Sequence, residues 1–318
     1  MVGLRTIKST QILGRPELPV TKVSERVYLI DTMALGQPGA VAVYVVKGEK
    51  VAIIDCGYTS SFESVLKGLS ELLISTNDVR YIIPTHVHLD HAGGAGSLLQ
   101  RMPNARVLVH EKGLPHLIDP TRLIQSSTTV FGEEVIRTIG IPSGVDPERA
   151  TALGPETHLD LGGISLTAIH TPGHAPHHVS VEIEEEKLLI SGDAIGIVYP
   201  RVRTVIPTTP PPSFDPAKIR DTLGKMRQMG SKKLLAPHYG VRPDVGSVLE
   251  TTETKTEAWL NEVRQLKKNG MLLDDIVPRF QRKVAGDAGM ASEELPQYAK
   301  LSIRITIMGM LHYLNRDA

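Results

Sequence analysis

A stretch of seven residues, 85–91, constrains this chain more than any other part of its sequence. It reads THVHLDH and lies between the apolar run 81–84 and the glycine-rich segment 92–96. These surroundings predict a strand that ends just before the stretch and a helix that starts after it. Histidine and aspartate side chains are usual ligands of zinc and of non-haem iron. Because His86 and His88 precede the expected bend, and Asp90 and His91 follow it, the stretch can serve two neighbouring metal ions.

The charge balance argues against a general polyanion binder. Lysine plus arginine number 35, as do aspartate plus glutamate, so the formal net charge is zero. Nucleic-acid-binding proteins usually carry a basic surface, and we therefore expect a small-molecule substrate and no nucleic-acid partner. The length of 318 residues allows one large domain or two modest ones.

The cysteine count and the apolar runs predict a cytoplasmic protein. Cys56 is the only cysteine, so no intrachain disulfide can form. We expect it to be buried at the end of a strand rather than reactive. Residues 1–8 lack the apolar core of a signal peptide. No apolar run approaches the ~20 residues that span a bilayer, so no membrane contact is expected.

Apolar patterns predict strands in the first half of the chain, with helices between some of them. The expected strands are 26–31, 40–47, 51–55, 79–84 and 105–110, and the expected helices are 60–73 and 96–102. Residues 111–153 show no clean strand. They contain short helical pieces broken by proline and glycine, and we interpret them as a helical insertion that covers a site.

The second half predicts further strands and then a run of helices. The expected strands are 163–171, 179–184, 187–191 and 233–236, and the expected helices are 216–229, 248–268, 272–280 and 296–314. The proline-rich segment 199–216 is either a linker or a wall of the substrate site. We expect residues 1–245 to form the catalytic domain and residues 246–318 a C-terminal helical extension packed on it. The last expected helix is apolar enough to pair with a second subunit, so a homodimer stays an alternative.

Three more potential ligands, His174, Asp193 and His238, each follow the end of an expected strand. Ligands at strand ends that a sheet brings together form a rigid site. With the four in residues 85–91 they make seven. Seven ligands are too many for one tetrahedral zinc ion and suit two metal ions that share a carboxylate.

This series, H-x-H-x-D-H followed by His, Asp and His, resembles that of the metallo-β-lactamase-fold hydrolase superfamily, which includes glyoxalase-II-like and lactonase-like members. All seven positions match, although the familiar third motif T-P-G-H-T-x-G-x here reads TPGHAPHH at 171–178. The resemblance implies an α/β fold, a four-layer αββα sandwich with the site at one edge. The ligand sets it implies are His86, His88 and His174 for one ion, Asp90, His91 and His238 for the other, and Asp193 as the bridge.

The resemblance therefore implies two divalent ions per chain, with zinc expected and iron or manganese as alternatives. Two close cations can generate a bridging hydroxide nucleophile at neutral pH. We expect a hydrolase that cleaves an ester-like bond in a small molecule, such as a lactone, thioester or phosphoester, with possible promiscuity. Asp90 is the expected catalytic residue, which orients the nucleophile or passes its proton to the leaving group.

Two other reactions stay open for this fold. The first is iron-dependent redox chemistry of the persulfide-dioxygenase or flavodiiron type. Flavodiiron proteins carry a fused flavodoxin domain, which nothing after Val245 resembles, and persulfide dioxygenases use a single iron with fewer ligands. The second is an RNA-processing nuclease, which needs a basic surface or exosite that the sequence does not reveal.

Several polar residues beside the motifs are candidates for substrate contact or for support of the ligands. Tyr199 follows Asp193 by six residues and is a candidate donor to a developing oxyanion, as is Tyr239 beside His238. His110 ends an expected strand. His178 lies in the third motif, where it is placed to support a metal-binding histidine.

Overall fold

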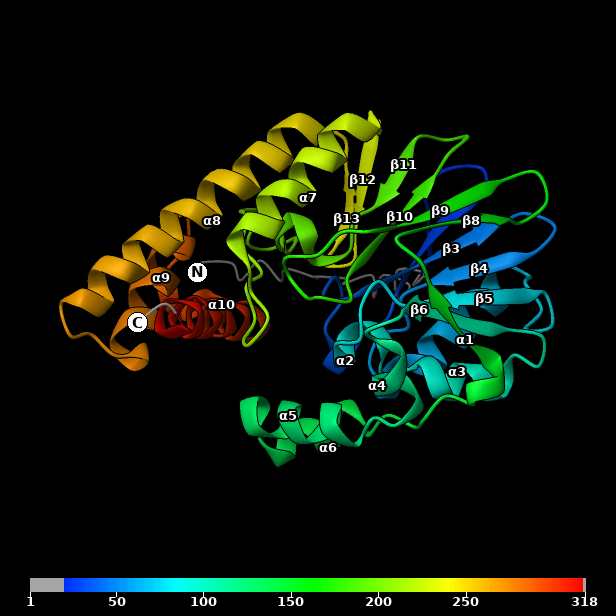
Figure 1. Ribbon diagram of the computed structural model, residues 1–318, viewed down its shortest axis with the longest axis horizontal. Coiled ribbons are helices and arrows are strands. Elements are labelled where there is room, and N and C mark those ends of the chain that lie inside the picture. Colours follow the sequence, from blue (N-terminus) through cyan, green and yellow to red (C-terminus); the bar gives the residue numbers. More distant parts are fainter. Residues whose placement is uncertain (1–19, 317–318) are drawn as a thin grey trace, which may run out of the picture.

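Two β-sheets pack face to face in the computed structural model, which describes residues 20–316 (Figure 1). The first sheet has the strand order β1-β2-β3-β4-β5-β6-β7 and the second β13-β12-β11-β10-β9-β8. Helices cover both outer faces, so the four-layer αββα sandwich is confirmed. The expectation about residues 1–8 lies outside the described residues.

The strands of the first sheet are β1 (Val20–Lys22), β2 (Val27–Asp31), β3 (Ala42–Lys47), β4 (Val51–Ile54), β5 (Val79–Ile83), β6 (Arg106–His110) and β7 (Ala150–Leu153). Those of the second are β8 (Glu156–Asp160), β9 (Ser165–His170), β10 (Val179–Ile183), β11 (Leu188–Ile190), β12 (Lys233–Ala236) and β13 (Gly240–Arg242). The α-helices are α1 (Phe62–Glu71), α2 (Leu89–Ala92), α3 (Ala95–Arg101), α4 (Leu114–Ile118), α5 (Thr121–Phe131), α6 (Glu133–Ile139), α7 (Pro216–Met229), α8 (Val245–Lys268), α9 (Leu273–Asp287) and α10 (Gln297–Arg316). The 3₁₀ turns are η1 (Ala34–Gly36), η2 (Thr59–Ser61), η3 (Pro147–Arg149), η4 (Gly192–Ile195) and η5 (Ser292–Glu294).

The central strands are buried on both faces, which explains their continuous valine and isoleucine runs. In β3, Ala42, Tyr44 and Val46 belong to the core between the two sheets. Val43 and Val45 point the other way, into the core that the first sheet forms with α1 and α3. Because side chains alternate along a strand, a strand between two layers must be apolar at every position.

Strand direction places the expected ligands at one edge of the sandwich. Strands β4 to β7 are parallel to one another. In the second sheet β11 is parallel to β12, and β9 runs the same way, because both β9 and β11 are antiparallel to β10. The segments after the carboxyl ends of β5, β9, β11 and β12 contain all seven expected ligands.

The insertion 111–153 contains α4, α5 and α6, but it is not helical throughout. Residues 150–153 form β7, which pairs in parallel with β6 at the edge of the first sheet. The expected end of the insertion at residue 153 was wrong. The sequence of β7, Ala-Thr-Ala-Leu, does not look like a buried strand, and only Leu153 is buried. The edge strands β8 and β13 were missed for the same reason, since neither contains a buried residue.

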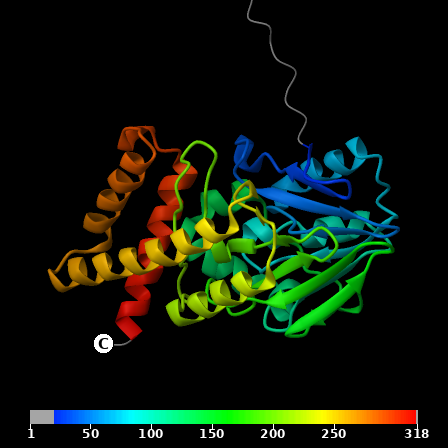
Figure 2. The same ribbon diagram turned by 90° about the horizontal axis from the view of Figure 1, so that it is seen from above.

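The C-terminal helices share a core with the second sheet. Trp259 of α8 lies 4.6 Å from Phe280 of α9 between ring centroids, and both are buried. Their cluster also contains Leu223 of α7 and Leu234 of β12. Figure 2 shows α9 and α10 beside the sandwich at one end of the molecule. Within residues 20–316, no helix combines the length and the apolar character needed to cross a membrane.

Candidate metal centre

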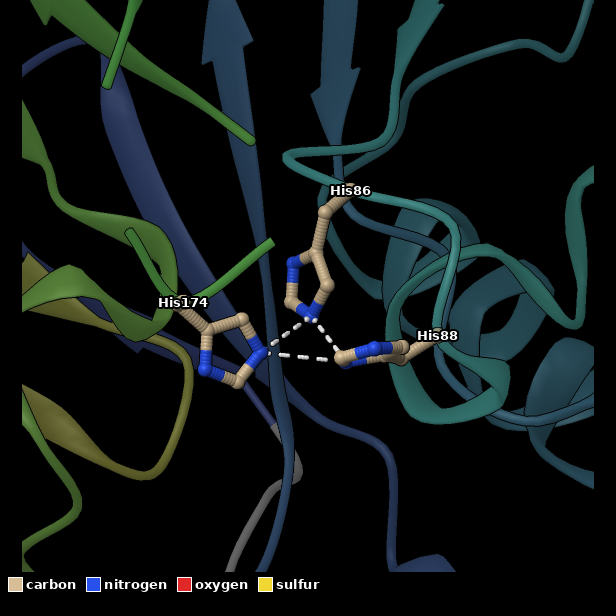
Figure 3. A group of neighbouring side chains, drawn as sticks. All are labelled: His86, His88 and His174. Atoms are coloured by element: carbon tan, nitrogen blue, oxygen red, sulfur yellow. Dashed lines mark hydrogen bonds between the residues drawn. The ribbon is translucent and has the colours of Figure 1, made fainter. Parts of the chain in front are cut away.

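Three histidines converge on one point at the edge of the sandwich (Figure 3). His86 Nε2 lies 2.8 Å from His88 Nδ1 and 3.2 Å from His174 Nε2. The remaining distance, from His174 Nε2 to His88 Nδ1, is 3.0 Å. His86 and His88 follow β5, whereas His174 follows β9 in the other sheet. The two sheets thus supply one compact triad of ring nitrogens, called the histidine triad below.

A second group, called the mixed triad below, contains Asp90, His91 and His238. Asp90 Oδ2 lies 3.3 Å from His238 Nε2 and 3.7 Å from His91 Nε2. Asp90 and His91 lie in the short helix α2, and His238 follows β12. In each triad the ligand atoms lie within 4.8 Å of one another, so either group can hold a metal ion.

Asp193 lies between the two triads and faces both. Its Oδ2 is 3.6 Å from His174 Nε2, in the histidine triad. Its Oδ1 is 3.5 Å from His91 Nε2 and 3.6 Å from His238 Nε2, in the mixed triad. The structure therefore brings all seven expected ligands together, with the two oxygens of Asp193 facing different triads.

In the mixed triad, backbone and carboxylate acceptors fix the histidine tautomers. His91 Nδ1 donates to Asp55 Oδ2 at 3.0 Å, and His238 Nδ1 donates to the Ala40 carbonyl at 2.8 Å. A hydrogen on Nδ1 leaves the lone pair on Nε2, which is the form that binds a metal. His91 Nε2 is buried and has no hydrogen-bond partner, so a cation at this position would satisfy an otherwise unpaired atom.

The histidine triad is supported in the same way. His174 Nδ1 donates to the Thr208 carbonyl at 3.2 Å. His86 Nδ1 lies 3.1 Å from Thr85 Oγ1, and it donates there because the Thr85 hydroxyl donates to Asp55 Oδ1 at 2.8 Å. Both Nε2 lone pairs therefore point towards the centre of the triad.

Asp55 is a functional residue that sequence reasoning missed. It is fully buried at the end of β4, and besides His91 it accepts the Thr85 backbone N–H at 2.7 Å. One carboxylate thus orients His91 directly and His86 through the Thr85 hydroxyl. The sequence signal was an acid directly after the buried strand 51–54 and before Cys56-Gly57, which we interpreted only as a strand end. Cys56 is buried there, as expected.

The two triads differ in charge. Burial and the neighbouring imidazoles lower the pKa values of His86 and His174 well below the usual value. Burial also lowers the pKa of His88 to about 4. The histidine triad is consequently neutral at pH 7, the state in which imidazole binds metal.

Three carboxylates, Asp90 of the mixed triad together with Asp55 and Asp193, surround His91. Burial alone would lower the pKa of His91, but Asp90, Asp55 and Asp193 outweigh burial and raise the pKa to about 10. Burial raises the pKa of Asp193, which shows that its charge is poorly compensated. Burial also acts to raise the pKa of Asp90, yet His91 and His238 hold it well below the usual value. These donors, buried lone pairs and carboxylates fit a divalent cation.

His178 supports Asp193, whereas its place in the third motif predicted support for a metal-binding histidine. Its Nε2 accepts the Asp193 backbone N–H at 3.0 Å. Its Nδ1 donates to Thr171 Oγ1 at 2.9 Å. The Thr171 hydroxyl donates to Ser180 Oγ at 2.9 Å, and the Ser180 hydroxyl donates to the Ser191 carbonyl. Burial lowers the pKa of His178 to about 3, which keeps Nε2 an acceptor at neutral pH.

The other three candidates lie differently from the expectation. Tyr199 has its ring 6.0 Å from that of His238, but its hydroxyl bonds Ser302 of α10 at 2.9 Å. Tyr239 packs against the core between the sheets. His110 stacks on His170 at 4.1 Å and accepts the Lys112 backbone N–H, and neither interaction involves an expected ligand.

The segment after η4 connects the last helix to the ligands. The Thr208 hydroxyl donates to the Asp193 carbonyl, while the Thr208 carbonyl accepts from His174. Next to it, Thr209 Oγ1 donates to the Thr306 carbonyl of α10 at 2.9 Å, and the Thr306 hydroxyl donates back to the Pro207 carbonyl. This part of the proline-rich segment is buried between α10 and the ligands, so it is not a solvent-exposed linker.

The comparison with known proteins agrees with this geometry. A family model described as the metallo-beta-lactamase superfamily matches residues 36–238, more than half of the chain, from η1 to the last expected ligand. The chain belongs to the metallo-beta-lactamase superfamily. The match includes both triads and Asp193, and it ends before α8 to α10 begin.

Relatives support the same assignment at modest identity. A metallo-beta-lactamase fold-containing protein of Sulfurisphaera tokodaii is 34% identical over 178 residues, which are 55% of this chain and 63% of that protein. An N-acyl homoserine lactonase of Rhizobium radiobacter is 30% identical over 120 residues, 37% of this chain and 41% of that protein. These alignments span less than two thirds of the relatives' lengths.

A solved structure resembles most of the chain. The crystal structure of an archaeal metallo-beta-lactamase superfamily protein from Sulfolobus tokodaii superposes with a TM-score of 0.64 at 26% identity. The match covers 88% of this chain and 94% of that protein.

Metal binding to the mixed triad should release protons. The pKa of His91 is raised to about 10, so at pH 7.5 the metal-free protein has a proton on His91 that an entering cation must displace. We expect calorimetric titration with zinc to give a binding enthalpy that depends on the ionisation enthalpy of the buffer, with about one proton or more released per chain. The affinity should fall as pH falls, because protonated imidazole competes with the cation. An enthalpy that is equal in phosphate-free buffers of different ionisation enthalpy would contradict this charge distribution.

Gly309→Ala should weaken metal binding without touching a ligand. A Cβ at Gly309 in α10 would lie 1.6 Å from the Thr209 carbonyl oxygen, so the segment holding His174 must shift. We expect faster zinc loss to a chelator and a lower free energy of unfolding. Gly224→Ala in α7 is the matched control, because a Cβ there meets nothing within 4 Å and alanine improves helix propensity by up to ~1 kcal/mol. Equal zinc retention in the two variants would show that α10 does not position the ligands.

Proposed function

We propose that this protein is a dinuclear metal-dependent hydrolase of an ester-like bond in a small molecule. The observation that carries the proposal is the position of Asp193, whose two oxygens face different triads. A structural metal site is closed by four ligands around one ion. Two incomplete triads that share one carboxylate instead suit two ions with coordination positions left for water and substrate.

His86, His88 and His174 would hold one divalent ion, Asp90, His91 and His238 the other, and Asp193 both. Two such cations would lower the pKa of bound water and polarise the oxygen of the bond under attack. Asp90 is the most exposed of the three carboxylates around His91, with 24% of its side chain accessible. Asp90 is ionised at neutral pH, and in this proposal it accepts a proton from the attacking water and delivers it to the leaving group.

The environment of Asp90 supports a small, largely apolar substrate. Leu89 packs in a cluster with Ile136 and Ile139 of the insertion. Several partly exposed apolar side chains of α5 and α6 pack against that cluster, namely Leu123, Ile124, Phe131 and Val135. A lactone, thioester or phosphoester with a short apolar group is the substrate class we propose. Similarity to an N-acyl homoserine lactonase supports the lactone. A screen of lactones, thioesters and phosphoesters would identify the class of bond that is cleaved.

Purified protein loaded with zinc should contain about two metal ions per chain, and His91→Ala about one. Both His91→Ala and Asp193→Ala should reduce turnover of activated esters by more than ~10²-fold, because each removes a ligand of the metal ions that activate water and stabilise the developing charge. Asp221→Ala, an exposed acid on α7, is the control and should keep full turnover. Elemental analysis and ester hydrolysis are the measurements.

Two results would decide against this proposal. One iron per chain, with no second metal under any loading condition, would instead favour the iron-dependent redox chemistry left open above. Full activity of Asp193→Ala with normal metal content would remove the shared carboxylate from the mechanism.

A further inference from the structure

Two buried tyrosines, Tyr44 and Tyr199, already use their hydroxyl hydrogens within the protein. Tyr44 donates to the Ala236 carbonyl at 2.8 Å. Ser302 Oγ donates its hydrogen to the Tyr298 carbonyl at 2.9 Å, so in the Tyr199–Ser302 contact Tyr199 must be the donor. Neither phenol retains a hydrogen for a substrate.

Tyr58 is the exception. The Tyr58 hydroxyl makes no hydrogen bond to any of residues 20–316. It is also not fully enclosed, because it is absent from the buried side-chain polar atoms of this region that have no partner. The side chain is half-buried. Its phenolic hydrogen therefore remains available to a ligand.

The backbone around Tyr58 is hydrogen-bonded to His91 and to the two glycines that follow α2. Cys56 N–H donates to the His91 carbonyl at 2.6 Å, and Gly94 N–H donates to the Gly57 carbonyl at 3.0 Å. After Tyr58, the Thr59 hydroxyl donates to the Gly93 carbonyl at 2.9 Å. These bonds hold the loop before η2 in register with α2, where Asp90 and His91 lie.

The ring of Tyr58 is held between two small apolar clusters. One contains Ala40, the residue whose carbonyl fixes His238. The other contains Leu89, the neighbour of Asp90, together with Ile136 and Ile139 of α6. The ring thus lies between the neighbours of two mixed-triad residues, and the insertion forms one wall of its position.

We propose that Tyr58 is a catalytic residue that donates a hydrogen bond to the substrate oxygen that gains negative charge during cleavage. This inference rests on the hydrolase function proposed above. Burial, with Asp90, Tyr199 and Asp193, raises the pKa of Tyr58 well above its usual value, so the phenol keeps its hydrogen at neutral pH. A donor aimed at a developing oxyanion stabilises the transition state more than the ground state.

For an ester the electron movement is as follows. The water oxygen bonds to the carbonyl carbon as its proton passes to Asp90, and the carbonyl π pair moves onto the carbonyl oxygen, which accepts the Tyr58 hydrogen bond without taking the proton. The pair then returns, the bond to the leaving oxygen breaks, and Asp90 gives that oxygen the proton. Tyr58 ends the cycle unchanged.

The test compares Tyr58→Phe with wild type in the zinc-loaded protein, using 4-nitrophenyl butyrate. Phenylalanine keeps the ring between its two clusters and removes only the donor. We expect kcat to fall ~10- to 100-fold, at or below the lower end of the losses seen for one oxyanion donor, with KM within about twofold. Zinc content and melting temperature should not change. Tyr28→Phe is the matched control and keeps full kcat, because the Tyr28 hydroxyl, near the chain surface, donates its hydrogen to the Glu25 carbonyl and makes no other hydrogen bond within residues 20–316.

A binding measurement separates this inference from the proposed function. Methylphosphonate is a tetrahedral oxyanion that resembles the intermediate, and its calorimetric Kd for zinc-loaded protein should rise about tenfold in Tyr58→Phe and stay constant in Tyr28→Phe. If wild type hydrolyses no ester, thioester or lactone but the tenfold change is found, the hydrolase proposal fails and the donor role of Tyr58 stands. Equal kcat and equal methylphosphonate affinity in Tyr58→Phe and wild type would overturn the role of Tyr58.

Discussion

Buried negative charge around His91 is the constraint on which the site depends. Asp55, Asp90 and Asp193 all act on this one imidazole and raise its pKa to about 10. Burying carboxylates is costly unless positive charge or hydrogen bonds compensate them. In the metal-free chain, a proton on His91 supplies part of that charge, and Asp193 and Asp90 also raise the pKa of His238. Divalent cations are better compensation, which gives a physical reason for the arrangement of ligands.

The rest of the fold holds the ligand lone pairs towards one centre. Two sheets supply the residues from the carboxyl ends of their strands, and the tautomers of His91, His174 and His238 each depend on an acceptor from another part of the chain. The Ala40 carbonyl holds His238, 198 positions away in sequence. Thr208 holds both His174 and Asp193, and α10 in turn holds the neighbouring Thr209. The C-terminal helices lie outside the matched family region, yet they contact the site through this segment.

Sequence reasoning predicted the sandwich and the seven expected ligands, because strand-end histidines and aspartates in this order are a local pattern with few alternatives. It did not predict β7, because β7 has few apolar residues and is recognisable as a strand only from its pairing with β6. Asp55 and Tyr58 were missed, since their roles depend on contacts with α2 that adjacent sequence does not encode. Tyr199 was a reasonable oxyanion donor from its distance to Asp193 along the chain. Its hydroxyl is instead bound to a serine 103 positions away, which only the tertiary structure reveals.

The central claim is that Asp193 joins two metal positions, and crystallography at the zinc absorption edge tests it most directly. Crystals of zinc-loaded protein should show two anomalous peaks ~3.5–4 Å apart, one beside His86, His88 and His174 and the other beside Asp90, His91 and His238, with one Asp193 oxygen near each. A single peak at the histidine triad, with Asp193 turned away from the mixed triad at saturating zinc, would contradict the account.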